Sequence, residues 1–192
     1  MRCFICAKLS LPIICTSCHN KLLIPNITTR KLGNLKVISL FKYSEISILL
    51  LTKHKPEGYR VYRYLGKKFM KPFIEEFVSP YNKDIYIIGI DEVIKGGYSH
   101  VAILTNSMKT KLSKPLYASL IATNSINYAG RDLEFRLDNP RDFIYKGSSN
   151  IEVVLVDDLI TTGLTIQEAK ELLLEYNVTV LFALTLGDAS DD

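Results

Sequence analysis

An apolar run that ends in two adjacent acids constrains the fold of this chain more than any other segment. Residues 151–156 read IEVVLV, which is typical of a central parallel strand covered on both faces. Asp157 and Asp158 follow, then the turn LITTG, and then residues 165–176 with the apolar spacing of a helix. A buried strand, a turn and a helix in this order predict an α/β domain.

The turn after this strand has the composition of a site for a phosphorylated sugar. In an open α/β sheet, the loops at the carboxyl ends of the strands face the ligand crevice. Two neighbouring carboxylates can accept hydrogen bonds from vicinal sugar hydroxyls or lie near a Mg²⁺ ion. Hydroxyls, a glycine and the amides of a helix N-terminus favour phosphate. The expected ligand contacts are therefore Asp157, Asp158, Thr161, Thr162, Gly163, Leu164 and Thr165.

Strand and helix patterns alternate along the rest of the chain. This alternation predicts a mostly parallel sheet flanked by helices. We expect strands at 36–43, 84–90, 116–122, 151–156 and 178–186, and helices at 45–53, 57–77, 98–109 and 165–176. Residues 21–35 read as an irregular connection. The expected domains are thus 1–35 and 36–192, the second with a basic part at 36–83 and the acidic pair in its remainder, 84–192.

All four cysteines lie in the first 18 residues, as two C-x2-C pairs: Cys3, Cys6, Cys15 and Cys18. Two such pairs supply the four thiolates that a structural Zn²⁺ prefers, so we expect a small zinc knuckle. Metal binding would supply folding energy that so short a segment cannot obtain from a core of its own. Two disulfides are one alternative, which a reducing compartment disfavours. Two buried or redox-active pairs are the other.

The net charge of +4 hides two oppositely charged halves. Residues 1–83 hold 15 basic and 4 acidic residues, whereas residues 84–192 hold 9 and 16. A basic half favours nucleic acid or an anionic membrane surface as a partner. The alternative is that both halves are solvated surface and neutralise each other across an interface.

The expected helix at 57–77 concentrates positive charge on one face. Its opposite face carries Val61, Leu65, Phe69 and Phe73 at helical spacing. Tyr59, Tyr62 and Tyr64 are interleaved, either to stack on bases or as core residues. Single strands bind to cationic grooves with aromatic platforms. We therefore expect nucleic acid to contact Lys53, Lys55, Arg60, Arg63, Lys67, Lys68 and Lys71.

The sequence shows neither a membrane-spanning segment nor a secretory signal. A membrane-spanning helix needs about 20 mostly apolar residues, which no run here approaches. The apolar stretch at 9–15 is interrupted by Pro12 and lacks a cleavage site. We expect a cytoplasmic protein, whose basic half would permit docking on the inner face of the cytoplasmic membrane.

Residues 153–165, VVLVDDLITTGLT, are similar to the 5-phosphoribosyl-1-pyrophosphate (PRPP) motif of type I phosphoribosyltransferases. The resemblance implies a phosphoribosyltransferase type I-like fold and a PRPP site that works with Mg²⁺. It implies that Asp157 and Asp158 contact the ribose hydroxyls and that residues 161–165 bind the 5′-phosphate. An ordinary polar loop after a buried strand is the alternative.

The order of features over most of the chain resembles the ComF (ComFC/GntX-type) competence proteins. These features are a four-cysteine knuckle, a basic middle and a phosphoribosyltransferase-like end. Shorter matches in the same order are 41–43, 51–55, 95–100 and 136–139 followed by Phe143. The resemblance implies a role in natural transformation, in which the protein handles incoming single-stranded DNA in the cytoplasm beside other DNA-uptake proteins at the inner membrane.

One loop departs from the family pattern. The family places arginine and lysine after the first strand of the domain, but residues 91–95 read DEVIK, with Lys95 as the one cation. Lys95 is the best pyrophosphate contact, and Arg131 or Arg136 could assist. Because transfer needs positive charge at the leaving pyrophosphate, we expect PRPP or a related ribose phosphate to bind without efficient turnover. The alternative is an active Mg²⁺-dependent phosphoribosyltransferase whose acceptor base the sequence does not name.

Overall fold

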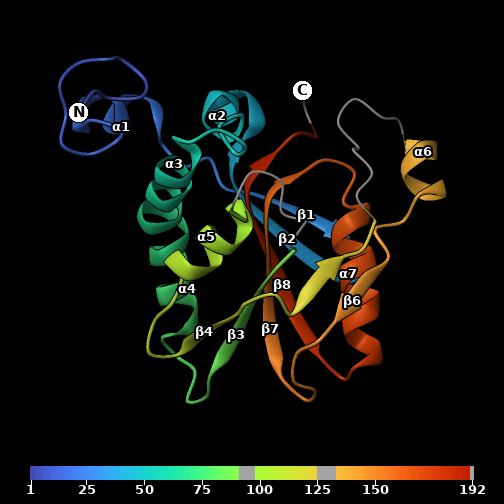
Figure 1. Ribbon diagram of the computed structural model, residues 1–192. Helices are drawn as coiled ribbons and strands as arrows, with labels where there is room; N and C mark the ends of the chain where they lie inside the picture. Colours follow the sequence, from blue (N-terminus) through green and yellow to red (C-terminus); the bar gives the residue numbers. More distant parts are fainter. Residues whose placement is uncertain (91–97, 125–132, 191–192) are drawn as a thin grey trace.

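The chain is seen in a computed structural model, which describes residues 1–90, 98–124 and 133–190, with the backbone alone for residues 133, 136 and 137. A six-stranded sheet forms its centre, in the order β1-β2-β8-β7-β3-β4 (Figure 1). Its strands are β1 (Thr28–Leu32), β2 (Leu35–Lys42), β3 (Ile85–Gly89), β4 (Ser113–Leu116), β7 (Glu152–Ile160) and β8 (Thr179–Asp188). Only β1 runs antiparallel to its neighbour. A separate antiparallel pair consists of β5 (Leu120–Ala122) and β6 (Phe143–Tyr145).

Helices cover both faces of the sheet. They are α1 (Thr16–Leu22), α2 (Tyr43–Leu50), α3 (Gly58–Leu65), the π-helical turn η1 (Gly66–Met70), α4 (Lys71–Val78), α5 (His100–Ser107), α6 (Leu133–Asp138) and α7 (Leu164–Glu175). Figure 1 shows α3, α4 and α5 on one side of the sheet, and α7 with β6 on the other. Each side has its own buried apolar cluster, which accounts for the apolar run along β7.

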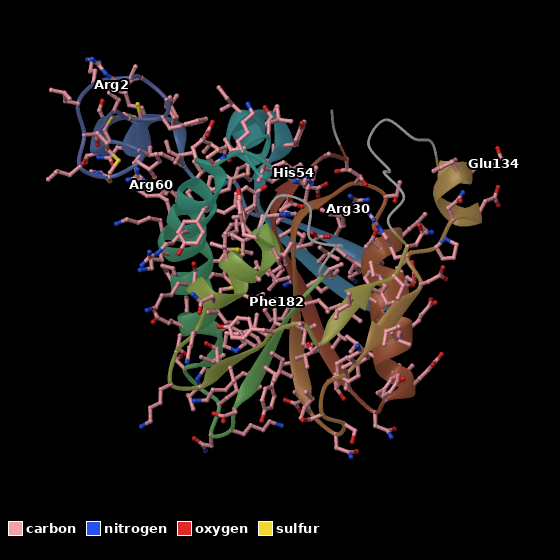
Figure 2. The ribbon with its side chains drawn as sticks, in the orientation of Figure 1. Arg2, Arg30, His54, Arg60, Glu134 and Phe182 are labelled. Carbon is pink, nitrogen blue, oxygen red and sulfur yellow. The ribbon has the colours of Figure 1, made fainter. Side chains whose placement is uncertain are left out.

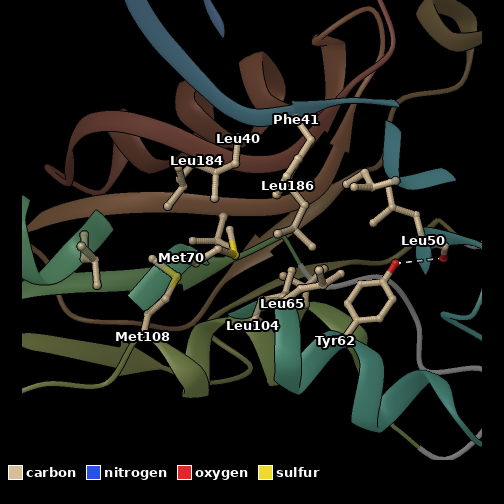
Figure 3. Close-up of a cluster of buried hydrophobic side chains, with 14 of the residues drawn as sticks. Leu40, Phe41, Leu50, Tyr62, Leu65, Met70, Leu104, Met108, Leu184 and Leu186 are labelled. Atoms are coloured by element: carbon tan, nitrogen blue, oxygen red, sulfur yellow. Dashed lines mark hydrogen bonds between the residues drawn. The ribbon is translucent and has the colours of Figure 1, made fainter. Parts of the chain in front are cut away.

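The side that faces α3 holds the larger cluster. Figure 3 shows Leu40, Phe41, Leu184 and Leu186 of the sheet against Leu65 and other residues from α3 to α5. Burial of these side chains is the main favourable term that holds the helices on the sheet. The parallel strands β2, β8, β7 and β3 all end at the same edge, which we call the carboxyl edge.

The predicted fold class, α/β with a mostly parallel sheet flanked by helices, is confirmed. The prediction of an irregular connection at 21–35 is wrong in part, because residues 28–32 form β1. A two-residue turn, Gly33-Asn34, joins β1 to β2, and Gly33 adopts a φ of +60° there. The sheet thus begins inside the segment that was expected to be a connector.

Three other boundaries differ from the expected ones. Strand β7 extends to Ile160, so the two acids lie inside it rather than after it. Residues 116–122 do not form one strand: β4 ends at Leu116 and β5 begins at Leu120. The expected helix at 57–77 is interrupted by η1. No helix among the described residues is both long and apolar enough to cross a membrane.

Candidate functional site

The four cysteines lie together, as their spacing predicts. Their sulfur atoms all lie within 4.8 Å of one another, and Cys6 Sγ is 3.8 Å from Cys15 Sγ. All four are free cysteines, so the disulfide alternative is not adopted. Sulfurs bound at about 2.3 Å to a tetrahedral Zn²⁺ would be about 3.8 Å apart. The donor set therefore fits a metal ion held by four thiolates.

The thiols differ in how easily they ionise. Burial raises the pKa of Cys3, but backbone hydrogen bonds from Cys15 and other amides outweigh burial and lower it to about 6. Burial and the neighbouring thiols raise the pKa of Cys18 to about 12. The cluster thus favours the thiolate of Cys3 and disfavours that of Cys18. A bound cation would stabilise all four cysteines as thiolates.

The knuckle packs against α3 and the helical turn after it. His19, which adjoins Cys18, is bonded through Nδ1 to the Tyr64 hydroxyl (2.9 Å) and stacks on Phe69 with ring centroids 5.4 Å apart. These contacts account for His19 as an interface residue rather than a metal ligand. Cys3 and Ile14 of the knuckle belong to the buried cluster on the α3 side of the sheet.

A groove lies between the knuckle and this helix, with a volume of about 250 Å³. One wall is the knuckle loop Leu11–Ile13, where Leu11 is 90% exposed. The other wall consists of Tyr59, Arg60, Arg63, Tyr64, Lys67 and Lys68. Figure 2 shows Arg60 on α3, close to the knuckle. None of its four cations forms an ion pair with another described residue. We call this surface the basic groove.

The structure brings four of the seven expected nucleic-acid contacts into the basic groove. Lys71 does not line it and pairs with Glu75 at 3.5 Å. Lys53 and Lys55 follow α2, and Lys53 turns toward the carboxyl edge instead. Of the two roles left open for the tyrosines, Tyr62 takes the core role, because it is fully buried and its ring fills the core on the inner face of α3.

At the carboxyl edge, Asp158 is buried among three donors that all meet its Oδ2 atom. The Tyr62 hydroxyl lies at 3.0 Å, His100 Nε2 at 3.4 Å and Lys53 Nζ at 3.5 Å. No described residue hydrogen-bonds its other oxygen, Oδ1. Asp157 is more exposed, and its Oδ1 accepts the Asp158 amide at 2.7 Å. The acid pair thus consists of one anchored carboxylate beside a more accessible one.

These contacts shift two pKa values. Burial alone would raise the pKa of Asp158, but the hydrogen bond from His100 and the charge of Lys53 hold it well below its usual range. Burial, reinforced by the charge of Asp158, raises the pKa of Tyr62 well above its usual value. Asp158 is therefore an anion, and Tyr62 is a neutral donor, at physiological pH.

The turn after β7 is held by residues that the sequence analysis did not identify. Arg30 of β1 donates to the Thr161 carbonyl oxygen (2.7 Å) and to Asp188 Oδ1 (3.1 Å). Gly163 has a φ of +84°, and a Cβ there would lie 2.6 Å from a methyl carbon of Leu32. The turn therefore requires glycine for both its conformation and its packing. No local sequence signal could have identified Arg30, because 131 residues separate it from Thr161.

The remaining expected ligand contacts follow the turn into α7. Gly163 is the N-cap of α7, which begins at Leu164, and Thr165 lies in its first turn. Thr161, Thr162 and Thr165 are partly exposed. Lys95, Arg131 and the side chain of Arg136 lie outside the described residues, so their expected pyrophosphate contacts stay predictions. The structure thus assembles the acids, the hydroxyls and a helix N-terminus at one edge.

Comparison with known proteins gives a similarity of fold alone. No protein-family model matches the chain, and no curated protein matches it. Similar solved structures include a hypoxanthine phosphoribosyltransferase from Staphylococcus aureus (17% identity, TM-score 0.44, 73% of this chain and 71% of that one). Adenine phosphoribosyltransferases from Saccharomyces cerevisiae (15%, 0.44, 90% and 88%) and Leishmania tarentolae (12%, 0.41, 88% and 86%) are also similar. At such identities and TM-scores, the function has to be argued from the side chains.

Proposed function

We propose that this protein binds single-stranded nucleic acid in the basic groove. The observation that carries the proposal is that Arg60, Arg63, Lys67, Lys68 and Tyr59 all line one groove. Cations that no described acid neutralises attract the phosphates, and a tyrosine that is 45% exposed offers a face to a base. A strand with unpaired bases can use both contacts, whereas a duplex hides its base faces.

In the setting that the ComF resemblance implies, this strand is incoming DNA during natural transformation. The protein would handle it in the cytoplasm or on the inner face of the cytoplasmic membrane, beside other DNA-uptake proteins. The groove suits that role because its contacts read backbone charge and base faces and would accept any sequence.

The carboxyl edge is proposed as a second site, for PRPP or a related ribose phosphate. Asp157 and Oδ1 of Asp158 would accept hydrogen bonds from the ribose hydroxyls. The turn at residues 161–165 would receive the 5′-phosphate at the start of α7. Mg²⁺ would accompany PRPP and offset the charge of its pyrophosphate.

An active phosphoribosyltransferase is the second candidate function, favoured by the acid pair beside a phosphate-type turn. Transfer needs positive charge at the leaving pyrophosphate, and the shortage of unpaired cations among the described residues there argues against efficient turnover. Two described cations at the carboxyl edge, Lys53 and Arg30, are paired with Asp158 and Asp188 respectively. Incubation with PRPP, Mg²⁺ and each common nucleobase decides the matter: release of pyrophosphate would establish transfer, and binding without release would establish a sensor or carrier of ribose phosphate.

The knuckle is proposed to hold one structural Zn²⁺. Four thiolates leave no open coordination position, so the metal would shape the groove wall at Leu11–Ile13 without taking part in chemistry. Metal analysis of purified protein should find one zinc per chain. Removal of the metal with a chelator should lower the melting temperature and weaken nucleic-acid binding together. A folded, metal-free protein with full affinity would contradict the assignment.

Charge reversal tests the groove. Arg63→Glu with Lys67→Glu should abolish binding of a fluorescent oligothymidylate in an anisotropy assay, because both side chains line the groove. Lys109→Glu with Lys111→Glu is the matched control, since these exposed lysines lie in the acidic half and do not line the groove. Full affinity in the first variant, or an equal loss in the control, would reject the groove as the binding site.

The ribose site has its own test. Asp157→Asn with Gly163→Ala should remove calorimetric binding of ribose 5-phosphate while oligonucleotide binding persists. The second measurement shows that the variant is folded. If the variant binds ribose 5-phosphate with an unchanged isotherm, the sugar site does not lie at the carboxyl edge.

A further inference from the structure

Helix α3 belongs to both proposed sites. Its outer face carries Tyr59, Arg60 and Arg63 into the basic groove. Its inner face carries Tyr62, whose hydroxyl reaches Asp158 at the carboxyl edge (3.0 Å). A ligand that contacts one face of a rigid helix can change the free energy of a contact on its other face.

Tyr62 has two possible hydrogen-bond acceptors for its one proton. Asp158 Oδ2 lies at 3.0 Å and the Leu50 carbonyl oxygen at 3.1 Å, the latter contact drawn in Figure 3. The hydroxyl can donate to either acceptor, but not fully to both at once. The proton of this buried hydroxyl can therefore point to either of two acceptors, and Tyr62 reaches both from the observed position of α3.

The arrangement of donors on Asp158 indicates which orientation of the Tyr62 hydroxyl favours ribose phosphate: the one that donates to Asp158. Tyr62, Lys53 and His100 all meet Oδ2, which leaves Oδ1 as the atom that a sugar hydroxyl would reach. Donation by Tyr62 holds the carboxylate in that orientation, and it requires α3 to lie in its observed position. Nucleic acid that binds Arg60 and Arg63 against the knuckle would hold α3 in the same position.

We propose that Tyr62 couples the basic groove to the carboxyl edge, so that single-stranded nucleic acid and ribose phosphate each raise the other's affinity. The coupling rests on the proposed function, because it needs both ligands to bind. Linkage makes it reciprocal: the factor by which ribose phosphate tightens oligonucleotide binding equals the factor in the opposite direction. For a coupling with the net strength of one ordinary hydrogen bond, we expect a factor of about five.

The test uses the full chain and two defined probes. Oligothymidylate affinity is measured by anisotropy with and without saturating ribose 5-phosphate, and ribose 5-phosphate affinity by calorimetry with and without oligonucleotide. The wild type should show the same factor of about five in both directions. In Tyr62→Phe, which keeps the buried ring and removes the hydroxyl, both factors should fall to one. Tyr117→Phe, whose hydroxyl donates to Asn106 instead, should keep the wild-type factor.

Each result bears on a different statement. If both ligands bind the wild type and the factor is one, the coupling is refuted and the proposed function stands. If Tyr62→Phe keeps the factor, coupling through Tyr62 is refuted. If either ligand fails to bind, the proposed function fails and the coupling fails with it. Should Tyr62→Phe not fold, hydrogen exchange of the wild type decides: ribose 5-phosphate alone must slow exchange in α3, and unchanged exchange refutes the coupling.

Discussion

The salt dependence of nucleic-acid binding follows from the number of cations in the basic groove. Each phosphate neutralised on a single strand contributes about −0.7 to the slope of log affinity against log salt. The four groove cations, Arg60, Arg63, Lys67 and Lys68, therefore predict a slope of about −2.8. Between about 50 and 150 mM KCl, the affinity should fall roughly 20-fold. The assay is anisotropy of a labelled oligothymidylate, which has no secondary structure of its own.

Neutral substitutions make this prediction quantitative. Arg63→Ala with Lys67→Ala should halve the slope to about −1.4, so that the same change in salt weakens binding only about fivefold. Lys109→Ala with Lys111→Ala, which removes the same charge elsewhere, should leave the slope at its wild-type value. A wild-type slope shallower than about −1, or equal slopes in the two double variants, would refute the assignment of phosphates to the groove.

Stacking can be separated from charge in the same assay. Tyr59 is 45% exposed at the groove, and a stacked base is worth about 1–3 kcal/mol. Tyr59→Ala should therefore weaken binding at every salt concentration, while the slope stays at the wild-type value because no counterion is involved. A change of slope without loss of affinity at low salt would show that Tyr59 does not stack on a base.

Two further predictions concern stability. In urea titrations, Gly163→Ala should lower the free energy of unfolding by more than Gly33→Ala. Both variants lose about 1 kcal/mol because alanine is strained at a left-handed φ. Only at Gly163 does the added Cβ also clash with Leu32. Equal losses of unfolding free energy in the two variants would contradict the clash with Leu32. The pKa of Asp158 is depressed in the fold, so its contribution is present above the unfolded pKa of about 3.9 and is lost as the pH falls below it. Acid should therefore destabilise the wild type more than Asp158→Asn in melts below about pH 4, and parallel curves would contradict this.

The parts of the fold that sequence could predict are those with a local period. The apolar run at β7, the apolar face of α3 and the paired cysteines each repeat over a few residues, and the structure has them where they were expected. Prediction failed where a contact is long-range. Strand β1 is stabilised by its pairing with β2 across the turn at Gly33. Residues 28–32 alone carry no signal of this pairing, so the sequence predicts only part of an irregular connection there.

The candidate site shows the same limit. Adjacent acids, hydroxyls and glycine identified the turn, because they are contiguous in sequence. The residues that orient it come from elsewhere: Arg30 from β1, His100 from α5 and Tyr62 from α3. Helical spacing alone could not decide whether Tyr62 faces the groove or the core, since it stands beside Val61 on the boundary between the two faces. The tertiary packing of α3 against the sheet decides it.

The described basic residues of the first half divide into some that pair with the acidic half and others that do not. Within the described part of the chain, three ion pairs join the basic half to the acidic half: Arg30–Asp188, Lys53–Asp158 and Lys83–Glu152. The first two lie at the carboxyl edge, where neutralisation across the halves builds the proposed sugar site. The cations of the basic groove take no part in these pairs, and their charge remains directed toward solvent. Positive charge that no described acid neutralises, beside an exposed tyrosine, attracts a polyanion. We place nucleic acid in the groove rather than at the carboxyl edge because the groove holds cations that have no ion-pair partner among the described residues.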